Sequence, residues 1–401
     1  MKKRNRTRTT LAVVSSTLLL AGCGEDAVEG PTGGTGDNPA VLVVGQAYTP
    51  EEYLTYVRVF PDVPEGDVDF RGFREFGNAN VYGEYGDVFV EQDGQVTRFS
   101  VNADLELVEG LTLSWEAYGI TSANASYSVF VSPQRAYTFA PDLGVVLVWD
   151  PEAMVLSGTI PLDFPARPGS METWAYDGYR IGDKVVWNVF SGDFDAIRQY
   201  PAVTLAMADA DGDAPVRFVE DARCLGGGPS RVAEDGTYYV QAGAYYGYFL
   251  AYGERTNAST CMLAMKDGET ELDPDFMVDY QGLTGSAVTD LWLPLGGDSY
   301  VVRAWDPEVP FPENPDDFWD NPALHSLLVD TKAGTSQPYP DLEGAIGIDG
   351  TARTVDGISY YQFNQNGYDV GGEVDVVALH PAGIRPKFHL HGFLLGLERL
   401  R

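Results

Sequence analysis

The chain has 401 residues, with 59 acidic and 26 basic side chains and a formal net charge of −33. This acidic balance argues strongly against nucleic acid and anionic lipid headgroups as partners, because both would be repelled over long range. The length is sufficient for one large domain, or two ordinary ones, with well-formed cores.

A basic leader opens the chain. Five Lys and Arg residues precede an apolar run at residues 11–20 that is too short to span about 30 Å of hydrocarbon. Residues 1–22 are therefore predicted to be a secretory signal peptide. Leu20-Ala21-Gly22-Cys23 resembles the bacterial lipobox, and the resemblance implies that Cys23 carries lipid. The alternative is an ordinary signal peptide whose cleavage site contains a cysteine.

Residues 23–40 read as a flexible, Gly-rich tether. Residues 24–40 contain no aromatic side chain and repeated Gly and Pro, so they cannot bury enough apolar surface to order themselves. Gly24 follows Cys23 where inner-membrane lipoproteins carry aspartate, so the lipoprotein rule favours the outer membrane, on its periplasmic or cell-surface face. The mature chain would keep 21 basic and 59 acidic residues, a net charge of −38.

From residue 41 onward, short β-rich runs alternate with Gly, Asp, Asn and Pro. Asx-Gly pairs such as Asp93-Gly94 and Asp356-Gly357 are typical of tight hairpins. Representative predicted strands are 41–44, 56–60, 87–91, 96–101, 128–131, 136–140, 145–149, 184–190, 237–241, 299–304, 326–330, 359–363 and 374–379. Because helical periodicity is nearly absent, we expect an all-β, antiparallel protein.

A degenerate repeat within residues 41–401 favours a β-propeller. A hydrophobic strand, an Asp or Asn turn and a short outer strand recur along the chain, which is typical of propeller blades. Seven blades are predicted, and six or eight are the alternatives. The predicted blades are residues 41–77, 78–119, 120–166, 167–223, 224–283, 284–344 and 345–401.

The lipobox, the tether and the blades, which include Phe73-Arg74-Glu75-Phe76-Gly77-Asn78-Ala79-Asn80, together resemble the MxcI-like bacterial surface lipoproteins. The resemblance implies a seven-bladed propeller that captures a ferric siderophore for an outer-membrane transporter. Ferric catecholates are anionic, however, so the acidic chain would need a local cluster of arginine and aromatic side chains. Arginines predicted near inner strands are Arg71, Arg74, Arg135, Arg231 and Arg303.

Asp209, Asp211 and Asp213, followed by Glu220, partly match a calcium loop, since hard cations prefer several converging carboxylates. Ala214 occupies the position of the turning glycine, and no flanking helices are evident. An acidic hairpin turn is the other interpretation. No cofactor is certain from the sequence, and calcium is the candidate.

Cys224 and Cys261 remain if Cys23 carries lipid. In an exported compartment they are predicted to form a structural disulfide. Tyr245 and Tyr246 belong to a tyrosine-rich segment at residues 238–252 that either stacks on a ligand ring or packs in the core.

Residues 305–324 form a long insertion rich in Pro, Asp and aromatic residues. Trp305 and its neighbours could cover the propeller face as a lid, or the loop could pack on its own aromatics. His389 and His391 lie two apart and so on one face of a strand. They could begin a metal site, although spacing identifies no third ligand, and an ordinary strand pair is the alternative.

No Gly-x-Ser-x-Gly, HExxH, P-loop or CxxC motif is present. The predicted function is therefore capture of a small ligand, a ferric siderophore, by a lipid-anchored propeller, with Arg74, Arg303, Tyr245, Tyr246 and Trp305 as contacts. One alternative is an extracellular propeller enzyme acting on a glycan or ester, which would show paired carboxylates of perturbed pKa. The other is a scaffold in an envelope complex.

Overall fold

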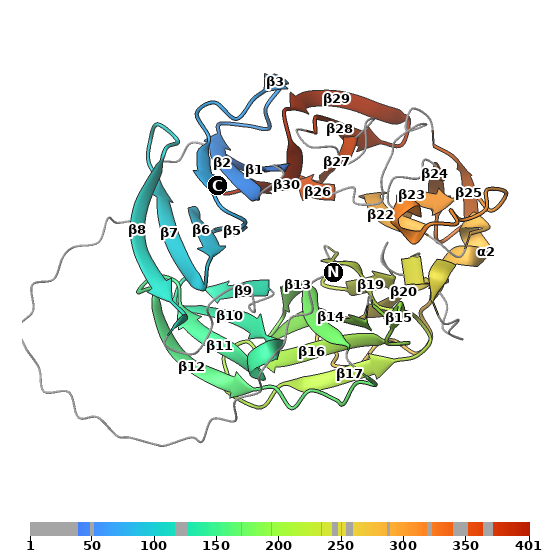
Figure 1. Cartoon of the computed structure of the whole chain (residues 1–401), viewed down its shortest axis with the longest axis horizontal. Coiled ribbons are helices and arrows are strands. Elements are labelled where there is room, and N and C mark those ends of the chain that lie inside the picture. Colours follow the sequence, from blue (N-terminus) through green and yellow to red (C-terminus); the bar gives the residue numbers. More distant parts are fainter. Residues whose placement is uncertain are drawn as a thin grey trace, which may run out of the picture.

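Seven β-sheets surround a common axis in the computed structural model of the chain (Figure 1). The predicted all-β class and seven-bladed propeller are both confirmed. The structure describes residues 39–48, 52–116, 127–169, 171–193, 195–233, 235–242, 248–249, 251–253, 260–286, 289–318, 323–339, 352–363 and 372–401. The predictions for residues 1–38, including lipidation at Cys23, lie outside these described residues.

The blades are given from the axis outward. The first contains β30 (Phe393–Arg399), β1 (Val41–Tyr48), β2 (Tyr53–Phe60) and β4 (Arg74–Phe76). The second contains β5 (Asn80–Glu84), β6 (Asp87–Gln92), β7 (Gln95–Val101) and β8 (Leu107–Ser114). The third contains β9 (Tyr127–Ser132), β10 (Arg135–Ala140), β11 (Val145–Asp150) and β12 (Val155–Pro161).

The fourth blade contains β13 (Glu172–Ile181), β14 (Lys184–Asp193), β16 (Val203–Asp209) and β17 (Arg217–Asp221), with β15 (Arg198–Gln199) beside β14. The fifth contains β18 (Gly227–Val232), β19 (Tyr238–Ala242), β20 (Cys261–Met265) and β21 (Val278–Asp279). The sixth contains β22 (Thr289–Gly296), β23 (Ser299–Trp305), β24 (Leu324–Asp330) and β25 (Thr335–Pro338). The seventh contains β26 (Ala352–Val355), β27 (Ile358–Phe363), β28 (Val374–His380), β29 (Gly383–Leu390) and β3 (Gly66–Val68).

Short helices α2 (Tyr280–Thr284), η2 (Pro141–Leu143) and η3 (Pro315–Phe318) join strands. Within the described parts of the chain, no helix is long and apolar enough to cross a membrane. Each of the thirteen predicted strands corresponds to an observed strand, and nine agree with it to within one residue at both ends. The other four, at 41–44, 56–60, 184–190 and 326–330, are shorter than the observed strands. Asp93 and Gly94 both have positive φ, 51° and 74°, as the predicted Asx-Gly hairpin turn requires.

The two ends of the chain close the ring. β1 lies between β2 and β30, with Val41 paired to Arg399. The prediction that assigned all of residues 345–401 to the last blade was therefore wrong for β30, which is the innermost strand of the first blade. β3 likewise leaves the first blade and pairs in parallel with β29 at the outer edge of the seventh.

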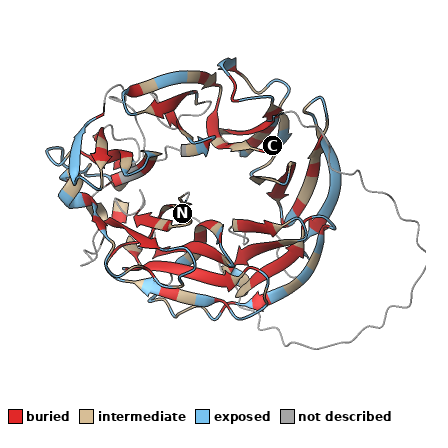
Figure 2. Cartoon of the chain, turned by 180° about the vertical axis from the view of Figure 1, so that it is seen from behind, coloured by how far each residue is buried: buried red, intermediate tan, exposed pale blue. Residues whose placement is uncertain are grey.

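The hydrophobic core is divided among the seven contacts between neighbouring blades. One separate cluster of buried residues lies at each contact. Side chains of β1 alternate between two of them, because successive residues of a strand point to opposite faces: Val41 and Val43 face the seventh blade, and Leu42 and Val44 face the second. In Figure 2, buried residues accordingly fill the middle strands, and exposed residues follow the outer rim.

Candidate functional site at the propeller axis

Six titratable side chains lie on the innermost strands of five different blades, around the axis of the ring (Figure 1). We refer to them as the axial cluster. Its members are Glu84 on β5, Tyr127 on β9, Asp177 and Tyr179 on β13, Arg353 on β26 and Glu398 on β30. All but Asp177 are partly exposed, so the cluster is within reach of solvent.

Glu84 and Glu398 form a pair of carboxyl groups on adjacent blades. Burial, together with the negative charge of Glu398, raises the pKa of Glu84 to about 7. Glu398 accepts a hydrogen bond from the Gly83 backbone N–H at 2.9 Å. A Cβ atom at Gly83 would lie 2.9 Å from the same carboxylate oxygen and 2.5 Å from Leu400, so glycine is what allows this close approach.

Arg353 carries the positive charge of the axial cluster. Its guanidinium donates a hydrogen bond to the backbone carbonyl of Leu395 on the neighbouring β30. Burial raises the pKa of Glu398, and the charge of Arg353 opposes that rise. Arg353 also opposes the burial-driven rise in the pKa of Asp177 and of the Tyr127 phenol, which lie on the opposite side of the ring. The cluster is therefore electrostatically coupled across the axis.

Asp177 joins two neighbouring innermost strands. It accepts hydrogen bonds from the backbone N–H and the hydroxyl of Ser230 on β18, both at 2.5 Å, and Tyr238 donates to the same hydroxyl at 2.8 Å. Burial raises the pKa of Asp177 to about 7, although these hydrogen bonds oppose the rise. Asp177 is only 7% exposed, so it contributes to the cluster through its charge and its hydrogen bonds to Ser230.

The chemistry available here is proton exchange and hydrogen bonding near neutral pH. A carboxyl group with a pKa near 7 is present both as an acid and as a base at that pH. In its neutral form it donates a hydrogen bond, while Arg353 offers fixed donors to an anionic oxygen. The arrangement suits a small ligand rich in oxygen atoms.

Neither predicted arginine contact lies in the axial cluster. Arg74 is on β4, the outermost strand of its blade, where it pairs with Glu109 and covers the ring of Phe99 at 4.5 Å. Arg303 is on β23, is 1% exposed, and donates to the Tyr361 hydroxyl at 2.6 Å. Of the five arginines considered from the sequence, Arg231 alone lies on an innermost strand, β18, where it contacts Tyr300.

The aromatic insertion packs on itself in its described part. Trp305 is 2% exposed, stacks on Phe318 at a centroid separation of 5.3 Å, and donates to the Val309 carbonyl at 2.8 Å. Tyr252 packs against Phe318 as well. These contacts favour the self-packed loop over a lid. Tyr245 and Tyr246 lie outside the described residues.

The carboxylates of the candidate calcium loop face different basic groups. Asp209 pairs with Lys184 at 2.6 Å, and Asp213 pairs with Arg135 at 2.6 Å. Glu220 pairs with Arg167 at 2.6 Å, on β17. Asp211 lies in the turn after β16. The structure thus distributes these side chains among separate ion pairs, as in an acidic hairpin turn.

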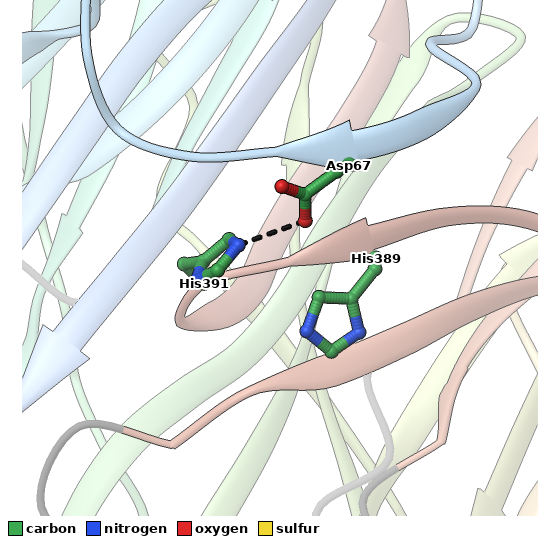
Figure 3. A group of neighbouring side chains, drawn as sticks. All are labelled: Asp67, His389 and His391. Atoms are coloured by element: carbon green, nitrogen blue, oxygen red, sulfur yellow. Dashed lines mark hydrogen bonds and ion pairs between the residues drawn. The ribbon is translucent and has the colours of Figure 1, made fainter.

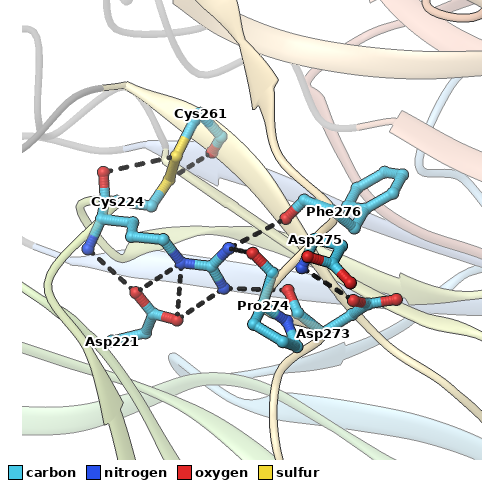
Figure 4. Close-up of polar contacts among 8 residues, drawn as sticks. Asp221, Cys224, Cys261, Asp273, Pro274, Asp275 and Phe276 are labelled. Atoms are coloured by element: carbon cyan, nitrogen blue, oxygen red, sulfur yellow. Dashed lines mark hydrogen bonds and ion pairs between the residues drawn. A yellow bond between two sulfur atoms is a disulfide. The ribbon is translucent and has the colours of Figure 1, made fainter.

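The predicted disulfide between Cys224 and Cys261 is present (Figure 4). It joins the turn after β17 to the start of β20, and both residues are fully buried. The adjacent Arg223 donates to Asp221 at 2.7 Å and to the carbonyls of Asp273 and Pro274 at 3.0 and 2.9 Å. The fourth and fifth blades are thus tied together at two neighbouring points.

The paired histidines have acquired neighbours from a distant part of the chain. His391 lies 2.8 Å from a carboxylate oxygen of Asp67 on β3 (Figure 3). Asp67 is 322 and 324 positions away from the two histidines in sequence, so the spacing of residues could not identify it. His380 is the last residue of β28, at the hairpin that leads into β29, and so lies at the opposite end of this strand pair from His389.

Sequence reasoning missed the axial cluster altogether. The strands that carry Glu84, Arg353 and Glu398 were absent from the predicted set. β5 and β26 contain few apolar residues, whereas β30 is apolar and was simply not among the predicted strands. A usable signal was the first strand of each repeat, since that strand lines the axis in a propeller.

No protein-family model matches this chain, and no curated protein matches its sequence. Among solved structures it is similar to a hypothetical selenium-binding protein from Sulfolobus tokodaii, with 10% identity, TM-score 0.55, and 90% and 94% of the two chains covered. It is also similar to a putative 6-phosphogluconolactonase from Bacteroides fragilis, with 11% identity, TM-score 0.52, and 92% and 99% of the two chains covered. A third similar structure is a periplasmic gluconolactonase from Pseudomonas aeruginosa, with 11% identity, TM-score 0.52, and 90% and 99% of the two chains covered. At this identity the comparisons concern the fold alone, and they support a seven-bladed β-propeller.

Proposed function

We propose that this chain is a ligand-binding propeller that holds a small, oxygen-rich molecule at the axial cluster. The observation that carries the proposal is the convergence of six coupled titratable groups from five blades on one axis. Binding sites combine a rigid scaffold with a few placed polar groups, and the innermost strands supply such a scaffold.

The finer form of the proposal is capture of a ferric siderophore for hand-over to an outer-membrane transporter. It is supported by the lipobox-like leader, which would anchor the chain at the outer membrane, and by the resemblance to MxcI-like lipoproteins. Arg353 takes the role that the sequence assigned to Arg74 and Arg303. Carboxyl groups with a pKa near 7 are partly neutral at that pH, which lessens the repulsion of an anionic ligand at the axis.

Binding is tested by titrating the protein with a ferric tris-catecholate while following tryptophan fluorescence and heat. We expect saturation, and at least a tenfold weaker affinity for Arg353→Met. Arg385→Met is the matched control, because Arg385 is exposed on the outer strand β29, and its affinity should equal that of the wild type. Equal affinity in both variants, or no saturable binding, would remove the siderophore as the ligand.

A second candidate function is hydrolysis of an ester or lactone, with Glu84 as general base. The observation that favours it is the Glu84 and Glu398 pair, since one carboxyl with its pKa near 7 beside another is a common arrangement in catalysis. Two of the similar structures bear the name gluconolactonase, so glucono-δ-lactone is the first substrate to test.

If Glu84 is the base, the rate should rise with pH and level off above about pH 7, because only the ionised carboxylate accepts a proton. Glu84→Gln should lower the rate at least a hundredfold, whereas Glu269→Gln in an exposed turn should leave it unchanged. Hydrolysis by Glu84→Gln at the wild-type rate would exclude this role.

A further inference from the structure

We propose that Asp67, His389 and His391 bind a divalent first-row transition metal ion such as Zn²⁺ at the outer edge of the seventh blade. The site lies on the rim of the propeller, away from the innermost strands, and is independent of the function proposed for the axis. It would join β3, which comes from the first part of the chain, to β29 near the C-terminus.

Strand register brings the three residues together. In the parallel pair, His389 of β29 lies opposite Asp67 of β3, and in the antiparallel pair it lies opposite Asp375 of β28. His391 is two positions farther on, so its side chain is on the same face as that of His389. Its backbone N–H donates to the Val68 carbonyl at 3.1 Å, which extends the pairing with β3 past the end of β29.

The donor atoms already lie close to one another (Figure 3). One nitrogen of each imidazole and one carboxylate oxygen of Asp67 all lie within 4.8 Å of each other. Ligand atoms around a tetrahedral zinc are about 3.3 Å apart, given metal–ligand bonds of about 2.0 Å. Binding of Zn²⁺ would bring the three ligand atoms closer to one another by about 1.5 Å at most. Side chains that are 37% and 40% exposed, as those of His389 and His391 are, can rotate that far.

Two further carboxylates orient the imidazoles. His389 Nδ1 lies 2.8 Å from Asp375, and His391 Nδ1 lies 3.2 Å from Glu373. If each Nδ1–H donates to its carboxylate, both Nε2 atoms remain as ligands, and His391 Nε2 faces Asp67 at 2.8 Å. Metal-binding histidines are characteristically held in this way by a carboxylate on the other ring nitrogen. Glu373 also lies 3.4 Å from His389 Nε2, where it can complete the coordination.

Charge and ligand chemistry select the kind of ion. Among the described residues, no lysine or arginine forms an ion pair with Asp67, Glu373 or Asp375. Arg71 interacts with Asp67 through its charge, but its ion pair is with Asp69. Imidazole nitrogens together with carboxylate favour zinc and its first-row neighbours, whereas calcium prefers oxygen ligands only. In the simpler interpretation the histidines are protonated and paired with the carboxylates, and added metal ion should then not bind.

The test is a Zn²⁺ titration of the chelator-treated protein, followed by calorimetry and thermal unfolding. We expect one Zn²⁺ per chain and a higher unfolding temperature, with no such increase from Ca²⁺ at the same concentration. His389→Asn and His391→Asn should each weaken binding at least a hundredfold, and Asp375→Asn about tenfold. His380→Asn is the matched control in the same blade and should bind Zn²⁺ as the wild type does.

A second measurement keeps the test informative if a variant is unstable. Zn²⁺ should slow hydrogen exchange in residues 66–68 and at the His391 amide of the wild-type protein, and should not do so in Asp67→Asn. Absence of Zn²⁺ binding, or wild-type affinity in both histidine variants, would show that the cluster is a set of ion pairs only.

Discussion

Carboxyl groups are buried between blades as well as at the axis. Glu91 on β6 is 6% exposed and accepts a hydrogen bond from the Tyr82 hydroxyl at 3.2 Å, and the same hydroxyl accepts one from the Ser128 backbone N–H of the next blade at 3.3 Å. Burial raises the pKa of Glu91 to about 7 from its ordinary value of 4.5. Asp177 repeats the pattern between the fourth and fifth blades. These groups hold protons in the folded protein that they release on unfolding.

The free energy of unfolding should therefore fall as the pH rises from about 4.5 to about 7, and level off above. A raised carboxyl pKa means that the folded state binds more protons across this window, so removing protons favours the unfolded state. Glu91 alone corresponds to a change on the order of 3 kcal/mol, since one pKa unit is about 1.4 kcal/mol.

Urea unfolding at a series of pH values measures this slope. The glutamine in Glu91→Gln cannot ionise, so the free energy of unfolding of this variant should depend less steeply on pH. Glu269→Gln at an exposed turn should reproduce the wild-type curve. A wild-type free energy that rises steadily from pH 5 to 7.5 would contradict the assignment.

Several strands that are buried on both faces were predicted from the sequence, although β16, β20 and β30, which are also apolar and largely buried, were not. β11 contains a continuous apolar run of five residues and β6 a shorter one of three, because each side of a blade packs against another blade. Strands whose side chains face the axis or solvent, such as β5 and β25, lack that pattern and were not identified. The disulfide was predictable for a different reason, because only two cysteines remain after the lipobox.

Removing the disulfide should destabilise the link between the fourth and fifth blades. A disulfide between residues 37 positions apart lowers the conformational entropy of the unfolded chain, which stabilises the folded state by about 3 to 4 kcal/mol on the loop-closure model. Cys224→Ala with Cys261→Ala should lower the free energy of unfolding by about this amount, with some further loss from the buried sulfur atoms. Wild-type protein unfolded in the presence of reductant should give a similar value, and an unchanged midpoint in both experiments would refute the role.

At the scale of the whole molecule, stability depends on closing the ring. β1 pairs with β30 on one side and β2 on the other, and its buried side chains contribute to the cores on both of its faces. The two ends of the described domain also meet, since the Ala40 N–H donates to the Arg401 carbonyl at 3.1 Å. The predicted tether therefore leaves the propeller at its closing seam.

Leu42→Ala tests this seam. Leu42 is fully buried on β1, so the substitution should cost about 2 to 5 kcal/mol in the free energy of unfolding. Leu111→Ala on the outermost strand β8 is the matched control, because Leu111 is 54% exposed, and it should change stability by less than about 0.5 kcal/mol. Similar losses in the two variants would mean that the seam has no special part in holding the ring together.

By itself, the sequence determined the all-β class, the seven repeats, most of the hydrophobic strands and the disulfide. These depend on local patterns or on a choice between very few partners. Only the tertiary structure placed β30 in the first blade, set Asp67 beside His391, and gathered Glu84, Arg353 and Glu398 at one axis. The physical reason is that closing a ring brings the chain ends together and joins the first strands of separate repeats. Some of these contacts join residues more than three hundred positions apart, and no local pattern in the sequence encodes them.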